Sequence, residues 1–302
     1  MKKVIRSPLF YMGDKYKLIN QLINFFPKKI NNFYEPFVGG GSVFLNIKAK
    51  KYYLNDLDKN LILLHKFLIS SSNNSKKFFG DLEKVITYYR LSRSFLEDIV
   101  PRSLKNKYKK TYYAKFNKKA YTQLKNDFND LKKKDYLKLY ILLIYGFNRI
   151  LRFNSSGKFN LPVGNVDFNK NSQEALINYF NVVKQKKVNF NNFDYAIFLK
   201  NKKFKKNDFI YCDPPYLITS GEYNKFWNEK NEIEFLQFLD QLNAKNIKWA
   251  LSNVTEYKGK KNNILIKWSK KYKVKKILSN YISFNDNSIK KFREVLIMNY
   301  EK

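Results

Sequence analysis

Tyr211-Cys212-Asp213-Pro214-Pro215-Tyr216 directly follows the apolar residues Phe209 and Ile210. This pattern is typical of the carboxyl end of a buried strand. Pro214 and Pro215 cannot continue a hydrogen-bonded ladder, and Pro215 holds the residue before it in an extended conformation. The stretch therefore predicts a stiff turn just outside the end of a strand, where open α/β sheets bind their ligands.

The chemical groups of this turn suit an amino group on an aromatic base. Asp213 offers a carboxylate, Pro214 a carbonyl oxygen and Tyr216 a flat ring. The two oxygens can accept both hydrogens of an exocyclic amino group while the ring stacks on the base that carries it. The alternative interpretation is a strand that ends in a proline-rich turn without chemistry.

Composition narrows the class of protein. The chain has 302 residues, of which 44% are apolar, so it can form one large domain or one domain with an insert. It has one cysteine and one histidine, which excludes a disulfide framework, a zinc or histidine metal cluster and a histidine-dependent triad. We therefore expect no metal site, and we interpret Cys212 as a packing residue and His65 as a residue at the edge of the core. Without a signal peptide or an apolar run of about 18 residues, the sequence predicts a cytoplasmic protein that does not enter a membrane.

The formal net charge is +34, which predicts a polyanionic partner because each neutralised phosphate releases counterions. The alternative explanation is a coding sequence rich in A and T, since lysine, asparagine, isoleucine, phenylalanine and tyrosine are all abundant. Against that background an arginine is more informative than another lysine. The seven arginines are Arg6, Arg90, Arg93, Arg102, Arg149, Arg152 and Arg293.

The N-terminal part of the chain has the pattern strand, glycine loop, helix at Asn32–Ser42. Its glycines, Gly39 to Gly41, allow the backbone to approach a ligand closely, as in nucleotide-binding α/β folds. A second predicted strand, Lys51–Leu54, ends at Asn55-Asp56, where an acidic side chain can accept hydrogen bonds from ribose hydroxyls. The loop lacks the G-x-G-x-x-G spacing, so a compact adenosine ligand is favoured over a nicotinamide cofactor.

Helical patterns surround these motifs. A glycine turn at Tyr11–Lys15 precedes a predicted helix that Asp14 caps and Pro27 ends. The stretch between about residues 65 and 208 is rich in lysine and aromatic residues and mostly helical, for example at Tyr136–Ile144, which predicts an insert between two halves of one sheet. Further on, the pattern predicts a helix at 233–242 and a strand at 248–253.

Together these motifs resemble the Dam-type DNA adenine-N6 methyltransferases, the α-ordered class of amino-methyltransferases, over nearly the whole chain. Tyr11–Lys15 resembles the family's N-terminal cofactor segment, although Asp14 stands where the family more often has a second glycine. The other matching segments are the catalytic tetrapeptide Asp213–Tyr216, the cofactor loop Glu35–Ser42, the ribose-binding strand end Asn55-Asp56, the base-reading hairpin at 146–154 and 157–164, and the last sheet strand at 294–300.

The resemblance implies an α/β fold with the Rossmann-like sheet of S-adenosylmethionine-dependent methyltransferases and an inserted, mostly helical target-recognition domain that carries a hairpin loop. Residues 1–65 and 190–302 would form the catalytic domain, and residues 66–189 the insert. The implied activity is site-specific transfer of a methyl group from S-adenosylmethionine to N6 of a flipped-out adenine in double-stranded DNA, most simply within GATC. The protein would act as a monomer in the cytoplasm of a bacterial or phage-infected cell, with a cognate restriction endonuclease as a possible functional partner.

The resemblance also assigns residues to roles. In the implied mechanism, Asp213 and the Pro214 carbonyl accept the two N6 hydrogens, and Tyr216 stacks on the adenine. Arg152 matches the family position that contacts the guanine beside the target adenine, whereas Arg149 stands where relatives often have glycine. The complete assignment is Asp213, Pro214, Pro215 and Tyr216 for catalysis; Tyr11, Lys15, Glu35, Phe37, Gly39, Gly41, Asp56 and Asp213 for the cofactor; and Arg152, Arg149, Asn154 and Pro162 for DNA.

Several alternatives stay open on the sequence alone. The target adenine could lie in another short palindrome. An RNA adenine methyltransferase or a protein glutamine methyltransferase would share the cofactor fold, but both more often have Asn before the two prolines. A cytosine-N4 methyltransferase usually has Ser at that position. A DNA-binding protein without enzymatic activity would not need Asp213, Asp56 and the glycine loop together.

Overall fold

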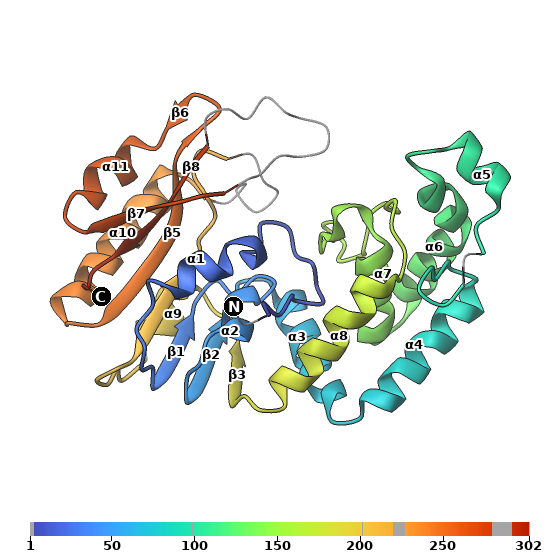
Figure 1. Cartoon of the computed structure of the whole chain (residues 1–302), viewed down its shortest axis with the longest axis horizontal. Helices are drawn as coiled ribbons and strands as arrows, with labels where there is room; N and C mark the ends of the chain where they lie inside the picture. Colours follow the sequence, from blue (N-terminus) through green and yellow to red (C-terminus); the bar gives the residue numbers. More distant parts are fainter. Residues whose placement is uncertain (1–2, 98, 201, 220–226, 280–291, 302) are drawn as a thin grey trace. The chain divides into compact units, whose positions relative to one another are not determined.

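A computed structural model describes residues 3–97, 99–200, 202–219, 227–279 and 292–301 of the chain (Figure 1). Contacts between residues divide the chain into two compact units. The helical unit consists of Met1–Asp14, Gly39–Leu45 and Asp58–Lys186, and the sheet unit of Lys15–Val38, Asn46–Leu57 and Lys187–Lys302.

The sheet unit is built on one mostly parallel sheet, to which the described residues contribute eight strands in the order β3-β2-β1-β4-β5-β8-β7, with β6 paired to β5 (Figure 1). The strands β3, β2, β1, β4 and β5 are mutually parallel, whereas β8 runs antiparallel to both β5 and β7. The prediction of an α/β fold with strands from both ends of the chain in one sheet is confirmed. The strands are β1 Asn32–Glu35, β2 Lys51–Asn55, β3 Val188–Asn191, β4 Phe209–Cys212, β5 Lys248–Tyr257, β6 Lys260–Lys261, β7 Lys273–Ile277 and β8 Phe292–Met298.

Both faces of the central strand β4 are buried, as expected for a parallel sheet that helices cover on both sides. On one face, the ring of Phe26 lies 5.0 Å from that of Phe209 and 5.3 Å from that of Tyr211. On the other face, Ile210 and Cys212 join a core cluster with residues of three helices. The helices of this unit are the 3-10 helix η1 Tyr16–Leu18, α1 Ile19–Ile23, α9 Tyr195–Lys200, α10 Glu229–Ala244 and α11 Asn263–Ser269.

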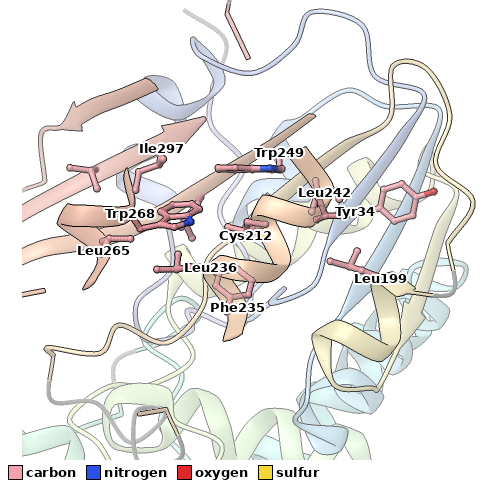
Figure 2. Packing of buried hydrophobic residues seen from close by; sticks show 14 of the residues in the cluster. Tyr34, Leu199, Cys212, Phe235, Leu236, Leu242, Trp249, Leu265, Trp268 and Ile297 are labelled. Atoms are coloured by element: carbon pink, nitrogen blue, oxygen red, sulfur yellow. The ribbon is translucent and has the colours of Figure 1, made fainter. Parts of the chain in front are cut away.

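Figure 2 shows how this core cluster holds α10 and α11 against the sheet. Trp249 of β5 is fully buried and stacks on Trp268 of α11, with ring centroids 5.7 Å apart. Phe235 of α10 packs in the same cluster. Burial raises the pKa of the Cys212 thiol well above its usual range, so the thiol stays protonated and the interpretation of Cys212 as a packing residue is confirmed.

The helical unit gathers around α7, in which every side chain from Leu139 to Tyr145 is fully buried. A helix that is apolar on all sides must be surrounded by protein, and the predicted helix at 136–144 is confirmed. Among the helices in the described part of the chain, none combines the length and apolar character needed to cross a bilayer. The helices are α2 Ser42–Asn46, which continues into the sheet unit, α3 Lys59–Ser72, α4 Ser75–Tyr89, α5 Arg102–Lys107, α6 Tyr112–Asp130, α7 Tyr136–Tyr145, the 3-10 helix η2 Phe147–Arg149 and α8 Lys170–Val183.

The predicted helix after the glycine turn is shorter than its apolar pattern indicated. It starts as the 3-10 turn η1 and ends at Ile23, before Pro27. The prediction that Asp14 caps it is wrong, because Lys15 occupies the capping position and no side chain makes the cap bond. The carbonyl of Lys15 accepts from the N–H of Leu18 at 2.8 Å, while its side chain is used elsewhere.

Candidate functional site

The predicted catalytic turn is part of a connected polar cluster in the sheet unit. Asp213 directly follows β4, and its Oδ2 lies 2.6 Å from the Nζ of Lys15. The hydroxyl of Tyr216 donates to Oδ1 of the same carboxylate at 2.8 Å. The Lys15 side chain is only 4% exposed, so its ammonium depends on these partners in place of water. The two ends of the tetrapeptide are therefore joined, and the carboxylate is fixed through both oxygens.

Glu294 completes this cluster, although the sequence analysis treated it only as the start of the last strand. It lies in β8, is 1% exposed, accepts from the Tyr216 hydroxyl at 3.4 Å and lies 4.0 Å from the Lys15 ammonium. Burial raises the pKa of Glu294, Lys15 opposes this effect and Asp213 adds to it. An acidic residue at the start of the apolar run Val295–Met298 is the signal that could have revealed it. We call Lys15, Asp213, Tyr216 and Glu294 the Asp213 cluster.

Acidic residues also follow the strands next to β4. Glu35 ends β1 and is buried, and Asp56 directly follows β2. Because β1 lies between β2 and β4 and all three are parallel, their carboxyl ends meet at one edge of the sheet. The predicted residues Glu35, Asp56 and Asp213 are therefore brought to the same edge.

The backbone around these strand ends is held by asparagine side chains. The amide of Asn55 donates to the carbonyls of Pro36 at 3.0 Å and Phe193 at 2.9 Å. The amide of Asn192 donates to the Asp56 carbonyl at 2.8 Å. These bonds fix the loop that positions the Asp56 carboxylate and the backbone beside Phe37.

Phe37 belongs to an aromatic group of the sheet unit. Its ring centroid lies 5.5 Å from that of Tyr195 and 6.1 Å from that of Trp227. Phe235 of the core cluster lies 5.5 Å away in an edge-on contact. Phe37 is thus anchored from the core side, which makes it a rigid aromatic residue next to the acidic strand ends.

The glycine loop lies in the helical unit together with Tyr11. Gly39 and Gly41 have φ values of 47° and 78°, in the left-handed region that favours glycine. A Cβ on Gly40 would come within 2.6 Å of the Tyr11 Cβ, and one on Gly41 within 2.4 Å of the Phe44 ring. Gly40 was not among the predicted site residues. Its contact with Tyr11 nevertheless favours glycine there, just as the positive φ values favour glycine at positions 39 and 41.

The side chain of His65 contacts the glycine loop at the Gly39 carbonyl. Its side chain is fully buried, so the prediction of a residue at the edge of the core is wrong, because the ring inserts under the loop. Its Nε2 lies 2.8 Å from the Gly39 carbonyl. Burial lowers the pKa of His65 to about 4, against a smaller opposite effect of the Gly39 hydrogen bond. The ring is therefore neutral at pH 7, and Nε2–H donates to the loop.

Residues 146–164 of the helical unit form the predicted hairpin. Antiparallel bridges join Gly146 to Val163 and Phe153 to Phe159. The base of the hairpin is tight, because a Cβ on Gly164 would lie 2.7 Å from the Gly146 carbonyl oxygen. Two facing glycines thus allow the hairpin to leave directly from the end of α7.

This hairpin holds the guanidinium of Arg152 by two hydrogen bonds to Asn160. Its Nε donates to Asn160 Oδ1 at 2.9 Å, and its Nη2 donates to the Asn160 carbonyl at 2.8 Å. Asn154 has a local role, since its Oδ1 accepts from the Lys158 N–H at 2.9 Å and closes the tip. The carbonyl of the exposed Pro162 accepts from the backbone near the base. Asn160 was not predicted, and its partnership with Arg152 appears only once the two hairpin arms are paired.

Arg149 has a different environment. Its guanidinium lies 4.0 Å from the centroid of the Phe10 ring, and that of Arg6 lies 4.5 Å from the same ring. Burial is the main cause that lowers the pKa of Arg149 to about 10. Of the two arginines predicted to contact DNA, Arg149 is half-buried in a cation–π contact and Arg152 is presented by the hairpin.

The chain matches the model of the D12 class of N6 adenine-specific DNA methyltransferases over residues 11–281. It belongs to this family. The matched region includes every residue that the sequence analysis assigned to catalysis, cofactor or DNA, whereas Glu294 lies beyond it.

Individual relatives agree with this membership. The chain is 35% identical to the modification methylase StsI of Streptococcus sanguinis, over 99% of the chain and 44% of that protein. It is 34% identical to the type II methyltransferase M.FokI of Planomicrobium okeanokoites, over 98% of the chain and 43% of that protein. It is 30% identical to a DNA adenine methylase of Haemophilus influenzae, over 77% of the chain and 71% of that protein. The chain thus spans less than half the length of the first two relatives.

Proposed function

We propose that this protein transfers a methyl group from S-adenosylmethionine to N6 of adenine in double-stranded DNA. The observation that carries the proposal is the Asp213 cluster, which places a fixed carboxylate at the end of a central parallel strand in a chain of the D12 class. The Asp before the two prolines also favours DNA adenine over the RNA, glutamine and cytosine alternatives. The net charge of +34 suits a polyanionic substrate.

The donor groups at the sheet edge fit the cofactor. Glu35 and Asp56 offer carboxylates for an ammonium and for ribose hydroxyls, and Phe37 offers an anchored ring for an adenine. We assign the same cofactor to Lys15 and Asp213, and to Tyr11 and the glycines Gly39 and Gly41 of the helical unit. When bound, S-adenosylmethionine supplies an electrophilic methyl group on a positively charged sulfur.

The residues of the Asp213 cluster then act on the adenine. A stacked base cannot present its amino group, so the adenine must be flipped out at a cost of a few kcal/mol. Each carboxylate oxygen of Asp213 has lone pairs beyond those used by Lys15 and Tyr216, so it can accept one N6 hydrogen while the Pro214 carbonyl accepts the other. Both bonds direct electron density to N6, and the carboxylate is placed to receive the proton that N6 releases. Lys15 positions Asp213, and the turn at Pro215 holds the Tyr216 ring for stacking.

DNA recognition is assigned to the insert at residues 66–189, and catalysis to residues 1–65 and 190–302. Arg152 is the residue we propose to read a guanine next to the target adenine, because an arginine fork matches guanine O6 and N7. The simplest site with this feature is GATC. Modification methylases among the relatives support a role in a restriction-modification system, with a cognate nuclease as functional partner.

The decisive experiment is methylome sequencing of a methylation-free host that expresses the chain. We expect N6-methyladenine in one sequence context with the wild type and none with Asp213→Ala. Asp81→Ala is the matched control, because Asp81 forms only a surface ion pair with Lys77 and its loss should leave methylation unchanged. Persistent methylation by Asp213→Ala, or another modified base, would contradict the proposal.

A further inference from the structure

A second site lies directly after the catalytic turn. A cavity of about 470 Å³ opens in the sheet unit, with one wall formed by Leu217, Ile218 and Thr219. The rest of the described lining includes the connection between β5 and β6 and the start of α11. Its residues are Tyr257, Lys258, Lys260, Lys261, Asn262, Asn263 and Ile264, and Glu229 of α10 is the one acidic residue among the described lining residues.

The lysine wall is a rigid hairpin. Tyr257 of β5 pairs with Lys260 of β6, and the two residues between them, Lys258 and Gly259, have φ values of 49° and 80°. Two successive positive φ values in a two-residue connection are the geometry of the tightest hairpin turn. The side chains of Lys260 and Lys261 are exposed, and neither forms an ion pair with another residue in the described part of the chain. Lys260 and Lys261 therefore present positive charge at the cavity.

A buried carboxylate holds the lining residue Asn262 in place. Glu232 is fully buried and accepts from the Asn262 amide at 3.0 Å and from the Asn253 amide at 3.2 Å. Its second oxygen accepts from the Trp227 indole at 2.7 Å. Asn262 is thereby held where it both lines the cavity and begins α11, so the cavity is a built feature of the sheet unit.

The other wall is continuous with the proposed base-binding turn. Leu217 follows Tyr216 directly, so their Cα atoms are about 3.8 Å apart. The N–H of Thr219 donates to the Tyr216 carbonyl at 3.1 Å, which folds the wall back onto the turn. The cavity lining therefore begins at the residue next to Tyr216, within reach of the backbone of a nucleotide whose base stacks on that ring.

We propose that this cavity binds the sugar-phosphate backbone of the DNA strand that carries the target adenine, next to the flipped nucleotide. Lys260 and Lys261 would contact a phosphate, and the apolar side chains of Leu217 and Ile264 suit a deoxyribose. Among the lining residues that the structure describes, three lysines stand against one glutamate, so the charge of this lining is complementary to that of a phosphodiester. This inference rests on the proposed function, because it takes the Asp213 cluster as the place of the flipped adenine.

The test pairs a protein variant with a neutralised phosphate. The protein variant is Lys260→Gln/Lys261→Gln, and the DNA is a short duplex with the methylated site, in which one phosphate near the target adenine at a time is a neutral methylphosphonate. The control is Lys273→Gln/Lys276→Gln, which removes the same charge from two exposed side chains of β7. Affinities are measured by fluorescence anisotropy as a function of salt, and N6-methyladenine formation is measured in parallel.

We expect one flanking methylphosphonate to weaken DNA binding by the wild type and by the control, but not by the Lys260/Lys261 variant. The plot of log affinity against log salt should also be shallower by about 1 for that variant. If each methylphosphonate changed the DNA affinity of all three proteins equally, the inference would be overturned. Methylation by the wild type would still leave the proposed function intact. If the wild type forms no N6-methyladenine, the proposed function itself fails.

Discussion

Acidification should destabilise the protein through its single histidine. The unfolded chain takes up a proton on His65 near its ordinary pKa of 6.5, whereas burial keeps the folded ring neutral down to a pKa of about 4. The stabilisation is therefore fully present above pH 6.5 and is lost as the pH falls towards 4. A difference of 2.5 between the two values corresponds to about 3 kcal/mol of unfolding free energy.

The assay uses the fact that the chain has one histidine, so the folded protein gives one imidazole signal by NMR. Its titration midpoint should lie near 4. Urea unfolding from pH 7 to pH 4 then compares the wild type with His65→Gln, which has no imidazole to titrate, so carboxylates common to both proteins cancel. We expect the stability difference between them to shrink by about 3 kcal/mol as the pH falls. A folded-state midpoint near 6.5, or parallel pH profiles, would refute the reasoning.

Three substitutions test the other parts of the site. Gly40→Ala should weaken S-adenosylmethionine binding, measured by calorimetry, because the new Cβ meets Tyr11. The control is Gly80→Ala in α4, where no atom lies within 4 Å of the new Cβ. It should leave binding unchanged and stabilise the folded protein by about 0.5–1 kcal/mol. Lys15→Met should abolish methylation and lower the unfolding free energy by about 3–5 kcal/mol, because the buried Glu294 and the partly buried Asp213 lose their ammonium. An additional Asp213→Asn should restore part of the stability but no activity. Asn160→Ala should release Arg152 and relax discrimination at one base pair in methylome sequencing. Lys110→Ala should instead weaken binding to all DNA sequences alike and reduce the salt dependence of binding. An unchanged methylated motif with Asn160→Ala would contradict the role of the Arg152 fork.

The sheet could be predicted because its signals are local. Phe209 to Cys212 form an apolar run that two prolines end, and Asn32–Ser42 changes from a strand pattern to glycines within a few residues. Each signal depends on neighbours in sequence, and the parallel order then brings the strand ends to one edge. The acidic residues Glu35, Asp56 and Asp213 could therefore be predicted from local sequence alone.

The residues that sequence reasoning missed or misplaced depend on contacts between distant segments. Glu294 joins Tyr216 across 78 positions, and His65 reaches the Gly39 carbonyl across 26. Gly40 is constrained by Tyr11, which no local pattern links to it. At the start of η1, Lys15 holds the capping position that was predicted for Asp14, and its side chain makes a long-range ion pair with Asp213. Packing thus overrides local propensity at the site itself.

The Asp213 cluster also has the opposite charge to the rest of the molecule. One ammonium serves two carboxylates in a buried place, although the chain as a whole carries +34. Burial is the main cause that raises the pKa of Glu294, and the neighbouring Asp213 carboxylate adds to it. A positively charged sulfonium or the N–H groups of an adenine amino group would offset the negative charge of these two carboxylates. In the proposed function the two kinds of charge have different roles. The net positive charge of the chain would attract the DNA backbone, and the negative cluster would hold the sulfonium and the adenine amino group.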